Sequence, residues 1–459
     1  MALQAPVPTR HALARPSGRP SAGLKLTRRG PVGWLTRAPA PIKLRVLVGM
    51  LVALCCGWGA LGAWTVNDHA AAAGDVVSTS EPLSLRAQQM YQSLSDADVT
   101  VTTAFLSGPQ ESLAMRDRYQ ADITQAAADL SALRAAAAAG QSGQSGSLNA
   151  SLAAVSAGLP SYTGDVAEAQ TDYALGFPLT GGSFLQVASE EMHLTLLPAA
   201  RSSYLDENAR LAAASSDATG LPWIIVVLVL AAATGLVLYG TQRWLTRRTH
   251  RVVNYGLAVA SVALLVASAW LISAFGVARA DLHSGVGSGA TPAETLAQAE
   301  IAAAQGRGDE LLNLISRSGD ASFEQNFQLV RGQLGPGRGT LLSSAAGSPG
   351  AAQVAAAQRD AQSWYAANDK VYQLDVAANY AAETQLVLGT GPGSSAAGFN
   401  KLEADLSRAI TADQVAFQSS ASAGAGTFDG LEAGVLIAAL LMAAGCAWGL
   451  NRRLEEYRG

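Results

Sequence analysis

Cysteine is almost absent from this chain of 459 residues, and the few that occur exclude a disulfide framework. Cys55, Cys56 and Cys446 all lie inside long apolar runs. The segments between those runs therefore have no thiol with which to form a bridge or bind a metal ion. Each of them must be held together by its apolar core alone.

Aromatic and charged side chains are also scarce. Aromatic residues make up 6% and charged residues 14% of the chain, whereas hydrophobic residues make up 49%. The apolar excess consists mainly of alanine, valine and leucine, which favours helices over an aromatic-rich β core. We therefore expect an all-α fold.

Motifs for catalysis are missing as well. No two of the five histidines have the spacing of a metal-binding pair, and no glycine-rich loop ends in Gly-Lys-Ser or Gly-Lys-Thr. His193 follows Glu190 and Glu191 but has no second histidine four residues away, so a solvated helix face is the simpler interpretation. We expect isolated surface histidines, no enzyme activity, no cofactor and no metal. The histidines are His11, His69, His193, His250 and His283.

Four apolar stretches are long enough to cross a bilayer, which takes roughly 20 residues of helix. They predict membrane spans at 43–66, 221–240, 255–277 and 430–450. The first stretch could alternatively be a signal peptide, because small residues such as Ala60 and Ala63 offer cleavage sites. It exceeds the roughly 7–15 apolar residues of a signal core, and this favours a span.

Basic residues next to the spans give an orientation. Sixteen lysines and arginines lie before or at the start of the first span, between the middle spans and after the last, with only Glu455 and Glu456 among them. The segment 67–220 carries seventeen acidic residues against six arginines, and 278–429 carries fifteen acidic against nine basic residues. The positive-inside rule then places both termini and the loop 241–254 in the cytoplasm, and both large segments outside the plasma membrane.

The two cytoplasmic ends are short. Residues 1–42 are rich in proline, arginine, alanine and glycine, a composition that favours disorder. This tail either anchors the protein electrostatically at the lipid surface or docks a cytoplasmic enzyme. Residues 451–459 form a second basic tail.

Apolar residues spaced three and four apart predict helices throughout the two large segments. In the first helix the stripe includes Ala87, Met90, Leu94 and Val101. Short breaks between the helices indicate an up-down-up-down four-helix bundle in each segment, and the repeated order of span, bundle and span predicts an internal duplication. The expected helices are Pro82–Gly108, Glu111–Ala139, Leu148–Leu175 and Phe184–Ala218 in the first segment, and Ala297–Gly319, Phe323–Gln333, Ala351–Leu388 and Phe399–Ser422 in the second.

Only basic side chains would attract an anionic ligand or partner to such acidic bundles. In the first bundle the candidates are Arg86, Arg116 and Arg118. The alternative is that they form ordinary salt bridges on helix surfaces.

The chain resembles the actinobacterial GlnX family of membrane proteins. The resemblance extends over most of the chain beyond residue 43 and rests on framework residues of the helices. They are Glu81-Pro82-Leu83-Ser84, Tyr91-Gln92-Ser93-Leu94-Ser95-Asp96-Ala97-Asp98, Ala104-Phe105-Leu106-Ser107-Gly108, Arg118-Tyr119, Ile123, Leu196-Leu197-Pro198-Ala199-Ala200, Trp364, Leu374-Asp375, Tyr380 and Phe399. More distantly, the bundles are similar to the four-helix sensor domain of chemoreceptors, although the methylation helices of those receptors are absent.

What the resemblance implies is a non-enzymatic relay. Its partners would be an amino-acid-binding lipoprotein of the GlnH type outside the cell and a serine/threonine kinase of the PknG type in the cytoplasm, with no nucleic acid involved. Two alternatives remain at this point. One is a membrane subunit of an export or envelope-assembly complex, and the other is a chemoreceptor-like sensor whose bundles bind the ligand directly.

Overall fold

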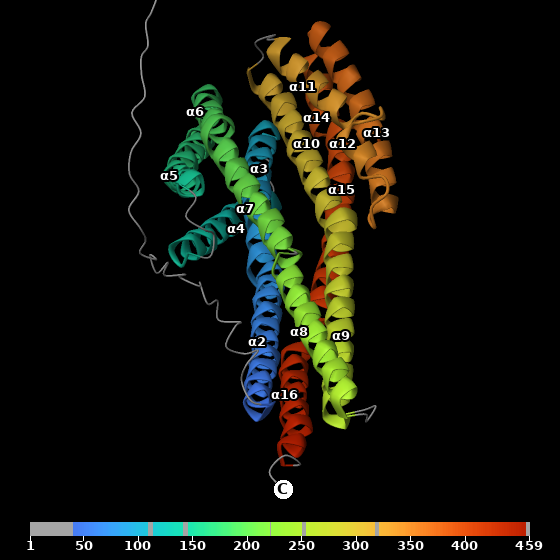
Figure 1. Cartoon of the computed structure of the whole chain (residues 1–459). Helices are drawn as coiled ribbons and strands as arrows, with labels where there is room; N and C mark the ends of the chain where they lie inside the picture. Colours follow the sequence, from blue (N-terminus) through green and yellow to red (C-terminus); the bar gives the residue numbers. More distant parts are fainter. Residues whose placement is uncertain are drawn as a thin grey trace, which may run out of the picture.

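The computed structural model describes residues 40–108, 113–140, 146–220, 222–249, 254–316 and 321–455. Within these ranges the chain is helical and has no strand, which confirms the predicted all-α fold class. The molecule is elongated, with four long helices at one end and two helical bundles at the other (Figure 1). Residues 1–39 of the predicted N-terminal tail lie outside the described residues. The same holds for 250–253 of the predicted loop and for 456–459 of the predicted C-terminal tail.

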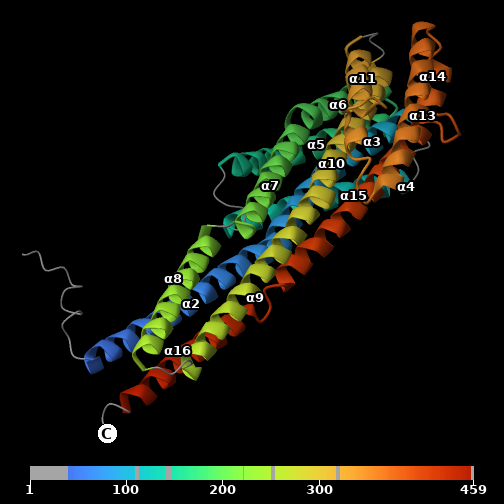
Figure 2. The same cartoon turned by 45° about the vertical axis from the view of Figure 1, so that its right-hand side comes forward.

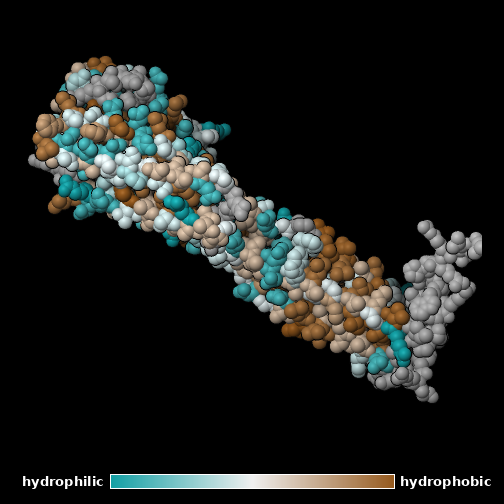
Figure 3. Space-filling view, turned by 90° about the vertical axis from the view of Figure 1, so that its left-hand side faces the viewer, coloured by the Kyte–Doolittle hydropathy of each residue, from teal (hydrophilic) through white to brown (hydrophobic). Residues whose placement is uncertain are grey.

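The four long helices form the membrane section. They are α2 (Ala40–Asp75), α8 (Pro222–Thr249), α9 (Tyr255–Gly285) and α16 (Leu431–Glu455). Each belongs to a helical stretch that is long and apolar enough to cross a membrane. Apolar side chains gather on the surface of this section, whereas hydrophilic ones predominate over the bundles (Figure 3). The predicted loop at 241–254 is shorter than expected, because α8 remains helical as far as Thr249.

Glycines bring α9 and α16 into close contact inside the membrane section. A Cβ on Gly256 would lie 2.4 Å from the carbonyl oxygen of Gly445 and 2.6 Å from the Cα of Gly449. Small residues four apart, as in Gly445-x-x-x-Gly449, allow two helix backbones to approach in lipid. Asn254 also joins the start of α9 to α16. Its side chain caps α9 and donates a 2.9 Å hydrogen bond to the carbonyl oxygen of Gly449.

The first bundle follows the predicted apolar stripes. It consists of α3 (Glu81–Leu106), α4 (Leu113–Ala138), α5 (Gly146–Ala174), α6 (Pro178–Glu191) and α7 (Leu197–Ala218), and the π-helical turn η2 (Met192–Leu196) joins the last two. On α3 the predicted stripe residues from Ala87 to Ala104 are buried. On α4, Leu130 and Leu133 are buried. The predicted fourth helix begins six residues early, at Pro178, since proline is well placed in a first helical turn.

The second bundle corrects one predicted helix. Its elements are α10 (Thr291–Ser316), α11 (Ala321–Leu334), the short α12 (Leu341–Ser344), α13 (Ala351–Val376), α14 (Tyr380–Leu388) and α15 (Ser395–Gly426). The prediction of one helix over Ala351–Leu388 is wrong, because the chain turns at Ala378, whose φ is +53°. The side chain of Asn379 then caps α14. Neither a glycine nor a proline marks this break in the sequence.

Two helices pass from the membrane section into the bundles without a break. The turn η1 (Val76–Ser80) joins α2 to α3, and η3 (Val286–Ala290) joins α9 to α10 (Figure 2). A proline follows each turn, Pro82 and Pro292. Proline has no N–H and its ring crowds the carbonyl four residues back, which disfavours an ordinary α-turn at this position. Each turn is instead a π-turn, which contains one residue more than an α-turn. The amides of Glu81 and Thr291 donate hydrogen bonds to the carbonyl oxygens five positions back, in place of the usual four.

The return connections are broken. Between α7 and α8 the helix ends at Ala218, and Pro222 starts the next helix. Between α15 and α16 four turn residues intervene, and the last of them, Gly430, has a φ of +74°. Each half of the chain therefore joins the membrane section through one continuous helix and one hinged helix.

The two bundles share one core. Buried apolar side chains from both form a single contiguous cluster, in which Met90 and Leu94 of α3 and Leu296 and Ala299 of α10 take part. A smaller cluster below it contains Val76 of η1, Leu211 of α7 and Phe417 of α15, with Val286 of η3 packed against them. The two π-turns thus pack into the same small core.

Replacing Gly256 by alanine is expected to destabilise the membrane section by about 1–3 kcal/mol, because the new methyl group must push two backbones apart. Gly276→Ala is the matched control on the same helix, since a Cβ there meets nothing within 4 Å. Thermal unfolding of the two variants in detergent measures the difference. Equal midpoints would contradict the packing described for α9 and α16.

Candidate sensor pocket and the contact between the bundles

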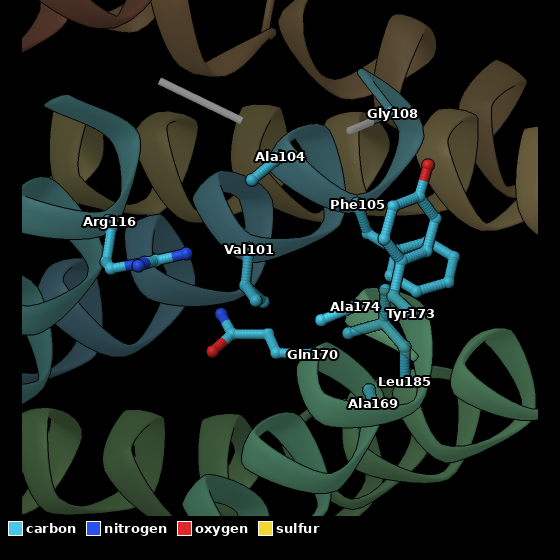
Figure 4. A pocket seen from close by; sticks show the side chains of 10 residues that line it. All are labelled: Val101, Ala104, Phe105, Gly108, Arg116, Ala169, Gln170, Tyr173, Ala174 and Leu185. Carbon is cyan, nitrogen blue, oxygen red and sulfur yellow. The ribbon is translucent and has the colours of Figure 1, made fainter. Parts of the chain in front are cut away.

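A pocket of about 260 Å³ lies in the first bundle near the end of α3 that points away from the membrane section. Helices α3, α4, α5 and α6 all contribute to its walls (Figure 4). The lining residues are Val101, Ala104, Phe105, Gly108, Arg116, Ala169, Gln170, Tyr173, Ala174 and Leu185.

Apolar and aromatic side chains make most of the pocket wall. Val101 and Leu185 are buried, and the rings of Phe105 and Tyr173 pack edge to face with centroids 4.9 Å apart. Gly181 allows this end of the bundle to close, because a Cβ there would lie 2.6 Å from the Ala169 carbonyl oxygen. The apolar part of the wall is therefore a packed surface formed by α3, α5 and α6.

Arg116 and Gln170 lie on one side of the pocket, and the aromatic pair lies on the other (Figure 4). Among the described lining residues, Arg116 alone carries a formal charge. This is the position that the sequence analysis named as a candidate anion contact. The structure thus places one of the three predicted arginines at a cavity.

The other two predicted arginines lie elsewhere. Arg86 is half exposed, and its Nη1 lies 3.4 Å from the Oδ1 of Asp129, a fully buried carboxylate. Arg86 therefore has the structural role of an ion-pair partner within the first bundle. Arg118 points toward the second bundle, where its Nη2 lies 3.9 Å from the Oε1 of Glu403 on α15. The three side chains do not form one site.

Carboxyl groups from both bundles meet beside Arg118. Asp96 of α3, Glu300 of α10 and Glu403 of α15 line a cavity of about 30 Å³, and we call these three residues the carboxyl cluster. The Nη2 of Arg118 lies 3.7 Å from the Oδ2 of Asp96. Glu300 is buried, and its Oε2 has no hydrogen-bond partner among the described residues.

Burial favours the neutral form of these carboxyl groups. Burial, reinforced by the charge of Asp96, raises the pKa of Glu300 to about 8. Burial and the neighbouring Glu403 raise the pKa of Asp96 to about 8, although Arg118 opposes this. Burial also raises the pKa of Glu403. The contact between the bundles therefore holds protons that an exposed carboxyl group would release near pH 4.

A second polar group was missed by the sequence analysis. The buried Asp98 accepts hydrogen bonds from the hydroxyl groups of Ser189 at 2.9 Å and Tyr162 at 3.4 Å. His193 of η2 lies beside it, with 3.8 Å between its Nε2 and the Oδ2 of Asp98. The signal was available, because Asp98 falls within the apolar stripe between Leu94 and Val101.

The predicted surface position of His69 is wrong, whereas the side chain of His193 is 24% exposed and thus only partly solvated. A Cβ on Gly308 of α10 would lie 2.8 Å from the Nε2 of His193, so this ring lies against the second bundle. His69 is buried at the base of the first bundle, with its Nε2 2.9 Å from the Gly220 carbonyl oxygen. His283 is exposed as expected, whereas His11 and His250 lie outside the described residues. In the part of the chain that the structure describes, no three His, Cys, Asp or Glu side chains could hold a metal ion together.

The contact between the bundles is expected to weaken as the pH rises. When the bundles separate, Glu300 becomes exposed and its pKa falls from about 8 to the ordinary value of about 4.3. The protonated Glu300 contributes fully to the stability of the contact below about pH 4. This contribution is lost as the pH rises to about 8. Hydrogen exchange in α3 and α10, corrected for intrinsic rates, should therefore increase over this range.

Glu300→Gln should reduce that pH dependence, because glutamine stays neutral throughout, while Asp96 and Glu403 still titrate. Glu168→Gln, which alters an exposed carboxyl group of α5, is the control and should retain the wild-type profile. An unchanged profile in Glu300→Gln would show that this proton does not govern the contact.

Comparison with known proteins bears on the first bundle. Residues 72–216 match a family model described as an actinobacterial sensor domain. The matched range runs from the end of α2 through α7 and contains the whole lining of the pocket. No curated protein and no solved structure matches the chain. The first bundle is therefore similar to an actinobacterial sensor domain, in a chain with four helices long and apolar enough to cross a membrane, and this favours a role in sensing or signalling.

Proposed function

We propose that this protein is a transmembrane signal relay that carries a change in its two bundles through the membrane section to a cytoplasmic partner. The observation that carries this proposal is the continuity of α2 with α3 and of α9 with α10. A helix of 67 residues, such as 40–106, spans about 100 Å and can transmit a displacement of one end to the other. The hinged connections after α7 and α15 let the remaining helices adjust.

The two continuous helices touch where the bundles meet. Met90 of α3 and Ala299 of α10 belong to the shared core, and the carboxyl cluster lies at the same contact. Alanine-rich helices bury little apolar area per residue, so a modest energy separates alternative packings. A partner that prefers one packing would shift the position of both continuous helices.

The input and output follow from the resemblance to the GlnX family. We infer that the bundles face the outside of the plasma membrane and meet an amino-acid-binding lipoprotein of the GlnH type. A kinase of the PknG type would receive the signal in the cytoplasm, and the relay itself would have no enzyme activity. The acidic character of both bundles and the basic residues around the spans support this orientation, with both termini inside.

We also infer that the relay arose by internal duplication. The turns η1 and η3 each have five residues, and α3 and α10 each have 26. Glu81 and Thr291, which begin these two helices, are each followed by a proline. Duplication would give two equivalent input helices that signal as a pair.

A flexible insertion at η1 should abolish signalling. Placing Gly-Ser-Gly-Ser after Val77 interrupts the continuous helix, whereas the same insertion after Thr219 enters a connection that is already broken. The measurement is phosphorylation of the kinase substrate in cells after addition of glutamate, aspartate or glutamine. The relay predicts loss of the response for the first variant and its retention for the second. The reverse pattern would refute the assignment of the continuous helix.

The partners can be tested directly. Cross-linking in intact cells followed by purification of the full chain should recover a solute-binding lipoprotein and a serine/threonine kinase, both identified by mass spectrometry. Recovery of export-complex subunits in place of both would exclude the relay.

A further inference from the structure

The pocket in the first bundle has the size of a small organic molecule. Its volume is about 260 Å³, whereas an apolar cavity of about 150 Å³ is enough to hold benzene. An aromatic ring with a short substituent therefore fits. A drug-sized ligand does not, because such ligands occupy pockets of about 300–1,000 Å³.

The wall offers two different kinds of contact. Phe105 and Tyr173 form an aromatic end, against which a ring or branched aliphatic group can pack. Arg116 and the Gln170 amide stand on the other side. A ligand that satisfies both ends has an apolar body and a polar head.

The charge of the lining selects the head group. A guanidinium group binds a carboxylate through charge-assisted hydrogen bonds, often two in parallel. Among the described lining residues no Asp or Glu is present to bind an ammonium group. An amine would therefore lose its hydration without gaining a carboxylate partner from these described residues.

We propose that this pocket binds a small carboxylate with an aromatic or branched apolar body and without an ammonium group. The ligand gives the relay a direct chemical input, separate from the amino-acid signal brought by the lipoprotein. Val101, Ala104 and Phe105 line the pocket and belong to α3, which continues through η1 into α2. Occupancy of the pocket therefore acts on the same continuous helix as the protein partner.

Calorimetry on the full chain in lipid nanodiscs tests the proposal with three probes that share one ring. Phenylacetate has the carboxylate alone, phenylalanine adds an ammonium group, and 2-phenylethylamine has the ammonium group alone. Phenylacetate should bind the wild-type protein, phenylalanine should bind at least about tenfold more weakly, and 2-phenylethylamine should not bind. Absence of phenylacetate binding, or equal binding of phenylalanine, overturns the proposal.

Variants locate the binding. Arg116→Gln should weaken phenylacetate binding at least about tenfold, whereas Arg134→Gln, an exposed arginine farther along α4, should leave it unchanged. Ala174→Trp fills the pocket from its exposed edge and should abolish binding. Circular dichroism confirms that each variant is folded. Binding that persists in both folded pocket variants places the ligand elsewhere and overturns the proposal.

The result is independent of the relay itself. Recovery of the lipoprotein and the kinase from cells carrying Arg116→Gln tests the relay, because Arg116 belongs neither to the carboxyl cluster nor to the core of the membrane section. Phenylacetate binding by the wild-type protein, without recovery of these partners, would refute the relay and keep the pocket. Recovery of the partners, without phenylacetate binding by the wild-type protein, would refute the pocket and keep the relay.

Discussion

The proline that follows each π-turn is the constraint around which the molecule is organised. Pro82 and Pro292 cannot be placed in a regular helix without loss of a hydrogen bond. In both halves the chain meets this constraint by widening one turn, and the helix continues. Because Val76 of η1 and Val286 of η3 share a small core with Phe417, the two widened turns are held together. In the proposed relay, motion of one continuous helix reaches the other through this core at the base of the bundles.

Above these turns, the contact between α3 and α10 combines a shared apolar core with buried ionisable groups. Apolar burial favours the closed arrangement. Glu300 and Asp96, in contrast, favour their neutral forms there, because burial raises the pKa of both. The proposed relay requires that such a contact close under one condition and loosen under another. Alanine-rich helices bury little apolar area per residue, which keeps the energy difference between alternative packings small.

Local patterns predicted most of the fold, while contacts between distant segments escaped prediction. The apolar stripe of α3 was read correctly, because helical spacing is a property of neighbouring residues. The break at Ala378 was missed because an alanine in a left-handed conformation leaves no signal in the sequence. Arg116 was named as a ligand contact and lines the pocket, whereas Arg118 was named with it and reaches Glu403 of the other bundle. Nothing local distinguishes these two arginines, since the packing of the two bundles decides their roles.

The central claim is that the bundles and the membrane section move together through the continuous helices. Spin labels at the exposed Met50 of α2 and Val259 of α9 report the distance between these helices far from the bundles. Pulsed electron–electron resonance on the full chain in nanodiscs, at pH 5 and at pH 9, measures that distance on either side of the titration of Glu300. The account predicts a shift between the two pH values that is smaller in the Glu300→Gln variant, in which Asp96 still titrates. The account would be contradicted if hydrogen exchange showed that the bundles open while the distance between the two labels stayed unchanged.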